Sequence, residues 1–220
     1  MSLETIEFET APNPTASIII LHGLGADGND FVPIAQELDL ASVGPVRFVF
    51  PSAPSRPVTI NGGYVMRAWY DILGTDLARR EDEAGLRESQ GLIEALIVKE
   101  RARGIAANRI VLAGFSQGCA MTFMAGLRHA ERLGGLLGMS GYLPLADLTA
   151  TERSAANVGV PIFQAHGSAD PMITMARATA SRDALVALGY PVEWHAYPMP
   201  HSVCPQEIVD MNHWLLRILA

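Results

Sequence analysis

The sequence is poor in the residues on which several classes of protein depend. Lys99 is the only lysine in the 220 residues. A P-loop needs a lysine after its glycine-rich loop, so that class is excluded, and a Schiff-base cofactor site is disfavoured. The two cysteines, Cys119 and Cys204, allow at most one disulfide. A secreted fold held together by a cystine framework is therefore not expected.

Long apolar runs and clusters of positive charge are also missing. No apolar run approaches the ~20 residues that span a bilayer, and the start of the chain has no basic segment followed by an apolar core. The net charge is −7, and basic residues gather in nothing larger than pairs such as Arg79 and Arg80. We therefore expect a cytoplasmic protein that binds no nucleic acid and does not insert stably into membranes.

The rest of the composition is typical of a globular protein, and predicted strands and helices alternate along the chain. Apolar residues make up 49% of the chain and charged residues 18%, so we expect one domain over residues 1–220. Short β-branched runs alternate with longer helical patterns, which predicts an α/β fold: a mostly parallel central sheet with helices on both faces. The predicted strands are 4–10, 16–22, 46–50, 109–115, 136–140, 161–166 and 192–197, and the main predicted helices are 27–38, 80–104, 120–132, 172–188 and 203–219.

The chain is organised around the run from Ile110 to Ala120. A buried strand stops at Gly114-Phe115-Ser116-Gln117-Gly118, and a helix-forming stretch follows. Strand, G-x-S-x-G and helix are the context of a nucleophile elbow, in which a strained turn projects the serine hydroxyl from the sheet. The alternative is a serine that caps an ordinary helix.

Two further polar side chains follow predicted strands at the same edge of the sheet. Asp170 comes after the strand 161–166, and His201 comes after the last strand, 192–197. In an open parallel sheet, sites form outside the carboxyl ends of the strands. The order serine, acid, histidine is that of the α/β-hydrolase fold, with Ser116 as nucleophile, His201 as base and Asp170 as the group that orients the histidine.

Other residues could fill these roles less well. Of the remaining histidines, His129 and His213 lie on predicted helices and His195 inside a strand, while His22 and His166 end strands, where packing or loop bonding is the default. Asp170 could instead cap the helix that follows it. Its rivals are Asp183, which is mid-helix, and Asp147, which is in a polar loop.

Two backbone N–H groups are the candidates for an oxyanion hole. One belongs to Gln117, directly after the nucleophile, and the other to Leu24, in the glycine turn after the strand 16–22. The same turn, from Gly23 to Gly28, fits the dinucleotide-binding pattern G-x-G-x-x-G. That fingerprint also needs an acidic residue at the end of the next strand, where this sequence has Pro51-Ser52-Ala53.

A long proline-rich stretch, 52–75, is expected to be a functional loop. In or just after it lie Met66, Trp69, Tyr70 and Leu73, which with Leu24 could line an acyl pocket. Alternatively, these side chains only cover the edge of the sheet. No polar cluster points to a charged acyl group, which favours short- to medium-chain acyl esters.

Five motifs together resemble one family, the small carboxylesterase/acyl-protein thioesterase family of α/β-hydrolases. They are His22-Gly23-Leu24-Gly25, Trp69-Tyr70-Asp71, Gly114-Phe115-Ser116-Gln117-Gly118, His166-Gly167-Ser168-Ala169-Asp170 and Pro198-Met199-Pro200-His201-Ser202-Val203. The resemblance implies a compact hydrolase with little or no cap and no metal or organic cofactor. It assigns Ser116, Asp170 and His201 to the triad and Leu24 and Gln117 to the oxyanion hole. Several members form homodimers, so a homodimer is among the expectations.

The sequence departs from the family at a few positions near this site. Cys119 stands where glycine is common, and Pro200 where glycine usually precedes the histidine. We expect Cys119 to be a small packing residue whose side chain points away from that of Ser116, and Pro200 to stiffen the histidine loop.

Together these features predict a serine carboxylesterase that acts through a covalent acyl-serine intermediate on short- to medium-chain carboxylic esters. One alternative is an acyl-protein thioesterase or lysophospholipase type of hydrolase, with the same chemistry on longer acyl chains. From a different class, the chain could be a non-catalytic binding module that kept the fold.

Overall fold

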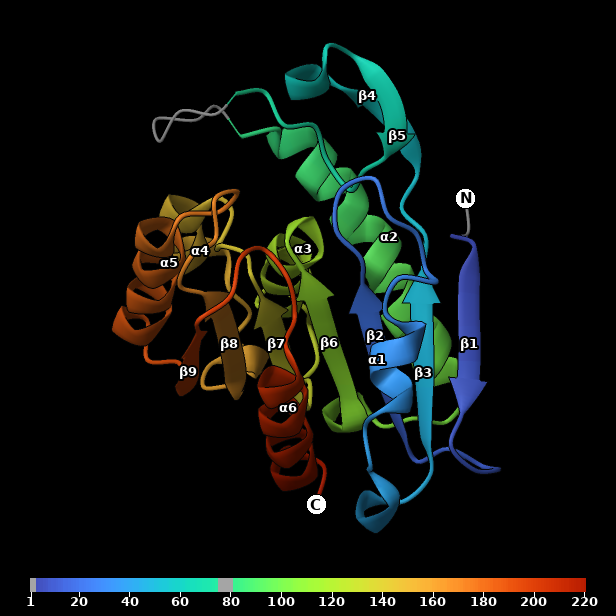
Figure 1. Cartoon of the computed structure of the whole chain (residues 1–220). Coiled ribbons are helices and arrows are strands. Elements are labelled where there is room, and N and C mark those ends of the chain that lie inside the picture. Colours follow the sequence, from blue (N-terminus) through green and yellow to red (C-terminus); the bar gives the residue numbers. More distant parts are fainter. Residues whose placement is uncertain (1–2, 75–80) are drawn as a thin grey trace.

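The computed structural model describes residues 3–74 and 81–220, and these form an α/β structure around one large sheet (Figure 1). The seven-stranded sheet has the order β1-β3-β2-β6-β7-β8-β9, and every neighbouring pair is parallel except β1 with β3. A mostly parallel sheet was predicted and is confirmed. The strands are β1 (Thr5–Glu9), β2 (Ala16–Leu21), β3 (Val46–Pro51), β6 (Ile110–Phe115), β7 (Gly135–Met139), β8 (Ile162–Gly167) and β9 (Val192–Tyr197).

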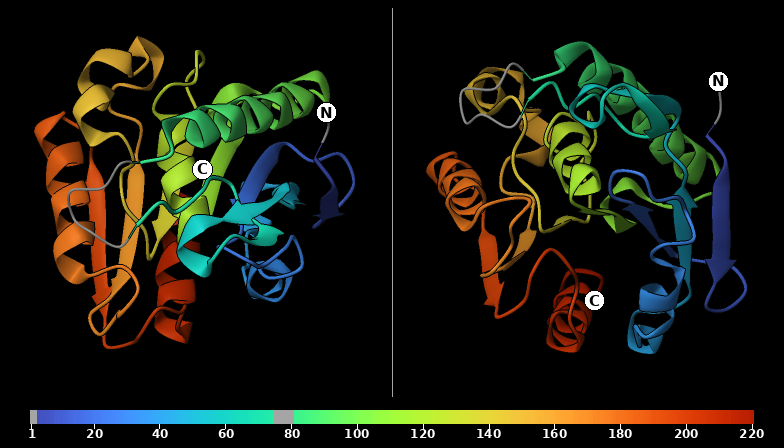
Figure 2. Two further views of the ribbon diagram at one scale, coloured as in Figure 1. Left: turned by 90° about the horizontal axis from the view of Figure 1, so that it is seen from above. Right: turned by 45° about the horizontal axis from the view of Figure 1, so that its top comes forward.

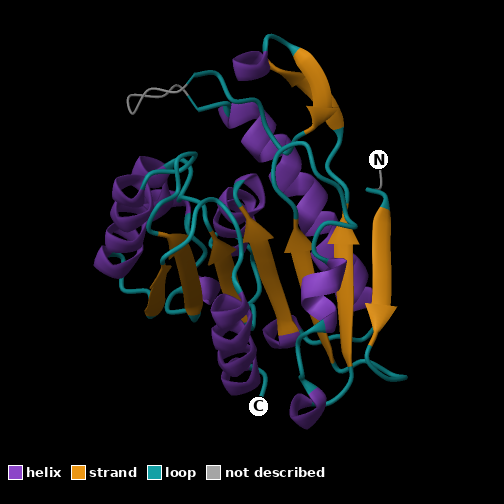
Figure 3. Ribbon diagram, viewed as in Figure 1, coloured by secondary structure: helices purple, strands orange, loops and turns teal. Residues whose placement is uncertain are grey.

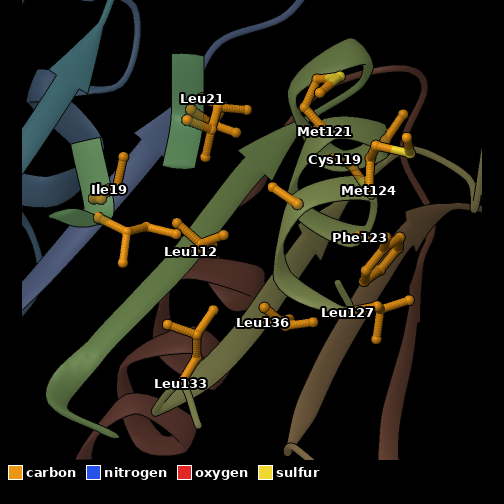
Figure 4. Packing of buried hydrophobic residues seen from close by; sticks show 14 of the residues in the cluster. Ile19, Leu21, Leu112, Cys119, Met121, Phe123, Met124, Leu127, Leu133 and Leu136 are labelled. Carbon is orange, nitrogen blue, oxygen red and sulfur yellow. The ribbon is translucent and has the colours of Figure 1, made fainter. Parts of the chain in front are cut away.

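Successive residues of the central strands bury their side chains on opposite faces of the sheet, which gives the molecule two apolar layers. On β2, Ile19 and Leu21 lie in one apolar cluster with residues of α2 (Glu83–Ala102), α3 (Gln117–Gly126) and α5 (Met175–Ala187). Ile18 and Ile20 lie in the other cluster with residues of α1 (Val32–Gln36) and α6 (Pro205–Ile218). Figure 2 shows these two groups of helices on opposite sides of the sheet. Figure 4 shows the first layer from close by, with Phe123 of α3 against the sheet. Helices on both faces, as predicted, follow from strands that are apolar on both sides.

Three of the predicted helices, 80–104, 172–188 and 203–219, begin and end within three residues of their predicted limits. The helix predicted over 120–132 begins three residues earlier and ends six residues earlier, at Gly126, and the helix Ala146–Glu152 was not predicted. The helices are α1 (Val32–Gln36), α2 (Glu83–Ala102), α3 (Gln117–Gly126), α4 (Ala146–Glu152), α5 (Met175–Ala187) and α6 (Pro205–Ile218). Side-chain caps set two of the starts: Asp82 accepts from the N–H of Gly85 before α2, and Thr174 accepts from the N–H of Arg177 before α5. The predicted helix 27–38 is wrong in its length, because a series of turns fills 27–31. Over the described ranges, no helix is long and apolar enough to cross a membrane.

The proline-rich stretch after β3 is not simply a loop, as the sequence predicted. It contains an antiparallel hairpin of β4 (Ser55–Val58) and β5 (Tyr64–Arg67), joined through a 3₁₀ turn (Thr59–Asn61) and two glycines, Gly62 and Gly63, with positive φ. The hairpin was not predicted because prolines in a sequence usually indicate a loop. They are tolerated here because both strands of a two-stranded ribbon are edge strands. Figures 1 and 3 show it beyond the carboxyl end of the sheet. Thr75, the predicted end of the stretch, and Arg80, the predicted start of the next helix, lie outside the described residues.

Candidate active site

The turn between β6 and α3 has the strained geometry of a nucleophile elbow. Ser116 has φ 56° and ψ −115°, a conformation that few residues other than glycine adopt. A Cβ on Gly114 would lie 2.2 Å from the carbonyl oxygen of Gly118, and a Cβ on Gly118 would lie 2.0 Å from the carbonyl oxygen of Leu21. Both glycines are therefore required by close backbone approach, and the turn is sharp because they are present.

Ser116 does not act as an ordinary helix cap. It occupies the N-cap position of α3, but its side chain makes no capping hydrogen bond. The backbone N–H of Gln117 belongs to the first turn of the helix, whose N–H groups have no intrahelical acceptor. The elbow thus presents two groups: a side-chain hydroxyl, which can attack a carbonyl carbon, and a backbone N–H at the start of a helix, which can donate to the carbonyl oxygen.

The carboxylate of Asp170 is held by donors on both of its oxygens. Its Oδ1 accepts from the backbone N–H groups of Met172 and Ile173, at 2.8 and 2.9 Å. Its Oδ2 accepts from Nδ1 of His201 at 2.6 Å. The side chain of Asp170 is completely buried and that of His201 is 18% exposed. Because Nδ1 donates to the carboxylate, Nε2 of His201 carries the free lone pair that a base requires.

The two loops that carry Asp170 and His201 are bonded to each other through their backbones. Ser168 N donates to Tyr197 O at 2.7 Å, and Ala169 N donates to Met199 O at 3.1 Å. A Cβ on Gly167 would come within 2.5 Å of the carbonyl oxygens of the histidine loop. The acid and the base are therefore positioned by one continuous unit at the ends of β8 and β9.

One cavity brings most of the predicted site residues together. It has a volume of about 300 Å³, at the lower end of the range for small-molecule sites. Ser116, Gln117, His201 and Leu24 all line it, so four residues predicted from the ends of three strands meet at one place. The rest of its wall is mostly apolar and comes from Ile60, Tyr70, Ile72, Tyr142, Pro171, Met172 and Ile173.

The four residues predicted to line a pocket have different places. Tyr70 lines the cavity, and its hydroxyl is 2.7 Å from that of Tyr142. Burial and Tyr142 together raise the pKa of Tyr70 well above its ordinary value, so Tyr70 is neutral. Trp69 is 0% exposed and lies behind the wall, where its indole N–H donates to the carbonyl of His22 at 2.9 Å.

Met66 and Leu73 are not among the residues that line the cavity. Met66 is half-buried on β5, where its sulfur accepts from the side-chain amide of Asn61. Leu73 is 44% exposed and borders a neighbouring hollow together with Tyr70 and Tyr142. The sequence indicated the right segment but not which of its side chains line the cavity, because the segment contains a hairpin that reverses the direction of the chain.

Cys119 is buried in the core, as predicted. It is 0% exposed, and a Cβ on Gly138 or Gly141 would come within 2.8 Å of its sulfur, so these two glycines leave the space that the side chain fills. Burial raises the pKa of the Cys119 thiol far above its ordinary value, which keeps it protonated. Figure 4 shows the side chain among the apolar residues of α3.

We therefore expect Cys119→Ala to retain most of the wild-type activity. Alanine leaves a small void and removes the weak contacts of the thiol with the backbones of Gly141 and Tyr142. We expect kcat/KM to stay within about threefold while stability falls by about 1 kcal/mol. Steady-state kinetics and thermal unfolding of the purified variant measure both. A folded variant that loses nearly all activity would contradict the packing role.

His166, near the acid, was predicted to pack or to bond a loop, and both are confirmed. His166 is fully buried, its Nε2 lies 2.8 Å from the carbonyl of Ile173, and the same atom lies 3.5 Å from Oδ2 of Asp170. Burial lowers the pKa of His166, so the ring is neutral and its Nε2–H is the donor. It thereby holds the turn whose N–H groups bind Asp170. No feature of the sequence near His166 could separate this role from ordinary packing.

Comparisons with known proteins agree in family and in fold. A model of the phospholipase/carboxylesterase family matches residues 4–219. Acyl-protein thioesterase 1 of Yarrowia lipolytica is 40% identical over 206 residues, which is 91% of each chain. The crystal structure of Arabidopsis thaliana SOBER1 has a TM-score of 0.88 at 30% identity and covers 93% of this chain and 99% of its own. Zea mays acyl-protein thioesterase 2 also has a TM-score of 0.88, at 27% identity and 99% coverage of both chains.

Proposed function

This chain belongs to the phospholipase/carboxylesterase family of α/β-hydrolases, and we propose that it is a serine hydrolase of long-chain acyl thioesters. The observation that carries the proposal is the meeting of the Ser116 elbow and the Asp170–His201 pair at one mostly apolar cavity. The sequence alone favoured short- to medium-chain esters. The curated relatives carry the name acyl-protein thioesterase and support the alternative better.

In the proposed reaction, Nε2 of His201 takes the proton of the Ser116 hydroxyl as its oxygen attacks the acyl carbonyl carbon. The negative charge that forms on the carbonyl oxygen is met by the backbone N–H groups of Leu24 and Gln117. The carbon–sulfur bond then breaks, and the imidazolium returns the proton to the departing thiolate. Asp170 keeps the imidazole in the productive tautomer and balances its positive charge.

The second half of the proposed reaction removes the acyl group from Ser116. A water molecule gives its proton to His201 and attacks the ester carbonyl, and collapse of the intermediate returns the proton to the Ser116 oxygen. The products are a free thiol and a carboxylic acid. The apolar wall formed by Ile60, Ile72 and Ile173 suits an acyl chain rather than a charged substituent.

A substrate series with an active-site probe tests the proposal. Wild-type protein should be labelled by a fluorophosphonate, mass spectrometry should place the label on Ser116, and an acyl burst should appear on a p-nitrophenyl ester. For matched acyl groups of four to sixteen carbons, kcat/KM should be higher for coenzyme A thioesters than for alkyl esters and should rise with chain length. Absence of both label and burst would favour the non-catalytic binding module. Label and burst with a preference for short oxygen esters would restore the carboxylesterase assignment.

A further inference from the structure

The side chain of Gln117 is engaged away from the cavity, while its backbone N–H is the proposed oxyanion donor. The residue is only 3% exposed. Its Oε1 accepts from the backbone N–H of Trp69 at 3.0 Å, and its Nε2 donates to the backbone carbonyl of Tyr70 at 2.8 Å. Because the backbone partners are one obligate donor and one obligate acceptor, they fix which end of the carboxamide is oxygen.

The segment that Gln117 holds is also fastened to the other side of the proposed oxyanion hole. The indole N–H of Trp69 donates to the carbonyl of His22 at 2.9 Å, two residues before Leu24. The hydroxyl of Ser89 donates to the carbonyl of Trp69. The His22 ring accepts from the N–H of Ala53 at 3.0 Å, and its Nδ1 donates to the carbonyl of Gly23 at 2.6 Å.

We propose that the Gln117 carboxamide is a positioning residue that sets the spacing of the two oxyanion donors, the N–H groups of Leu24 and Gln117. It acts through Trp69, which joins the elbow to the end of β2, and the inference rests on the function proposed above. Oxyanion donors must lie 2.7–3.1 Å from the developing charge, and a displacement of about 1 Å can cost about 100-fold in rate. We call the two hydrogen bonds from the Gln117 side chain to Trp69 and Tyr70 the clamp. Loss of the clamp should lower kcat much more than it changes KM.

Gln117→Glu tests the clamp because its hydrogen bonding depends on protonation. As a carboxylic acid, the new side chain can accept from the Trp69 N–H and donate to the Tyr70 carbonyl, as the amide does. As a carboxylate, it places negative charge about 2.8 Å from that carbonyl oxygen, at the distance the amide nitrogen now has. Burial should raise the pKa of the introduced carboxyl above its usual value of about 4.3.

We expect the kcat of Gln117→Glu, divided by that of wild type at the same pH, to be near one at about pH 5. It should fall by about 10- to 100-fold by about pH 8.5. The ratio cancels any dependence on pH that both proteins share. Burial lowers the pKa of His22 and raises that of Tyr70, which favours the neutral form of each of these two groups beside the segment.

Two variants serve as controls. Gln117→Met fills the space without polar atoms, so its kcat ratio should be low and independent of pH. Gln164→Glu places a carboxyl in another buried site, where the amide of Gln164 donates to the carbonyl of Ala178 at 3.1 Å, so its ratio should not vary with pH. Fluorophosphonate titration gives the concentration of competent sites for every variant.

The outcomes separate the clamp from the proposed function. If wild type is neither labelled nor active, the proposed function is wrong, and so is the positioning role of Gln117 that rests on it. If wild type is labelled and active but the Gln117→Glu ratio stays constant with pH, or Gln117→Met keeps full kcat, the clamp alone is overturned. A pH-dependent ratio with unchanged KM supports it.

Discussion

Ser116→Ala is expected to lower kcat by about 10⁶-fold, the largest effect among the substitutions considered for this protein. The substitution removes the oxygen that forms the covalent intermediate but leaves the cavity and the oxyanion donors in place. Residual hydrolysis about 10³- to 10⁴-fold above the uncatalysed rate should remain. Fluorophosphonate labelling should disappear completely, and single-turnover kinetics with an acyl thioester measure the loss of rate.

The effect should not add to that of His201→Ala. A base without a nucleophile, or a nucleophile without a base, leaves the same incomplete pair, so the double variant should resemble either single variant within about tenfold. Ser168→Ala is a matched control, because Ser168 is exposed on the loop beside Asp170 and contributes its backbone rather than its hydroxyl. Its activity should be unchanged. Additive losses, or a Ser116→Ala variant within 100-fold of wild type, would contradict the assignment.

The arrangement of the site could be predicted to the extent that parallel-sheet geometry determines it. Apolar strands separated by helical patterns indicate parallel pairing, and parallel strands bring their carboxyl ends to one edge. That reasoning selected Leu24, Ser116 and His201, which now line one cavity, and Asp170, which binds His201. It worked because each of these residues lies within four positions of the end of a predicted strand.

The supporting contacts could not be predicted in this way, because they join residues far apart in the sequence through side-chain orientation. Gln117 reaches back to Trp69 and Tyr70, 47 or 48 positions earlier in the chain. Neither partner uses a side chain in these bonds, so no pattern of residue types could reveal them. The pocket gives a second example: the segment was identified correctly, but Met66, on β5 of the hairpin, and Leu73, beyond it, do not line the cavity, whereas Ile60 and Ile72 do.

Asp170→Asn should lower kcat by about 10⁴-fold, for a reason that the local hydrogen bonds make specific. The backbone N–H groups of Met172 and Ile173 donate to Oδ1, so the asparagine carbonyl oxygen must take that position. The amide NH₂ is then forced into the place of Oδ2 and donates to Nδ1 of His201. The imidazole proton must move to Nε2, and a protonated Nε2 cannot accept the proton of Ser116.

His201 of Asp170→Asn should therefore carry the wrong tautomer in a site whose geometry is otherwise intact. The ¹⁵N chemical shifts of the His201 ring should show Nδ1 protonated in wild type and Nε2 protonated in Asp170→Asn. Asp147→Asn and Asp183→Asn are matched controls, since both carboxylates are exposed, and their kcat values should stay within about twofold of wild type. Retention of more than about a tenth of the activity by Asp170→Asn would mean that another acid orients His201. A large loss in either control would identify that acid.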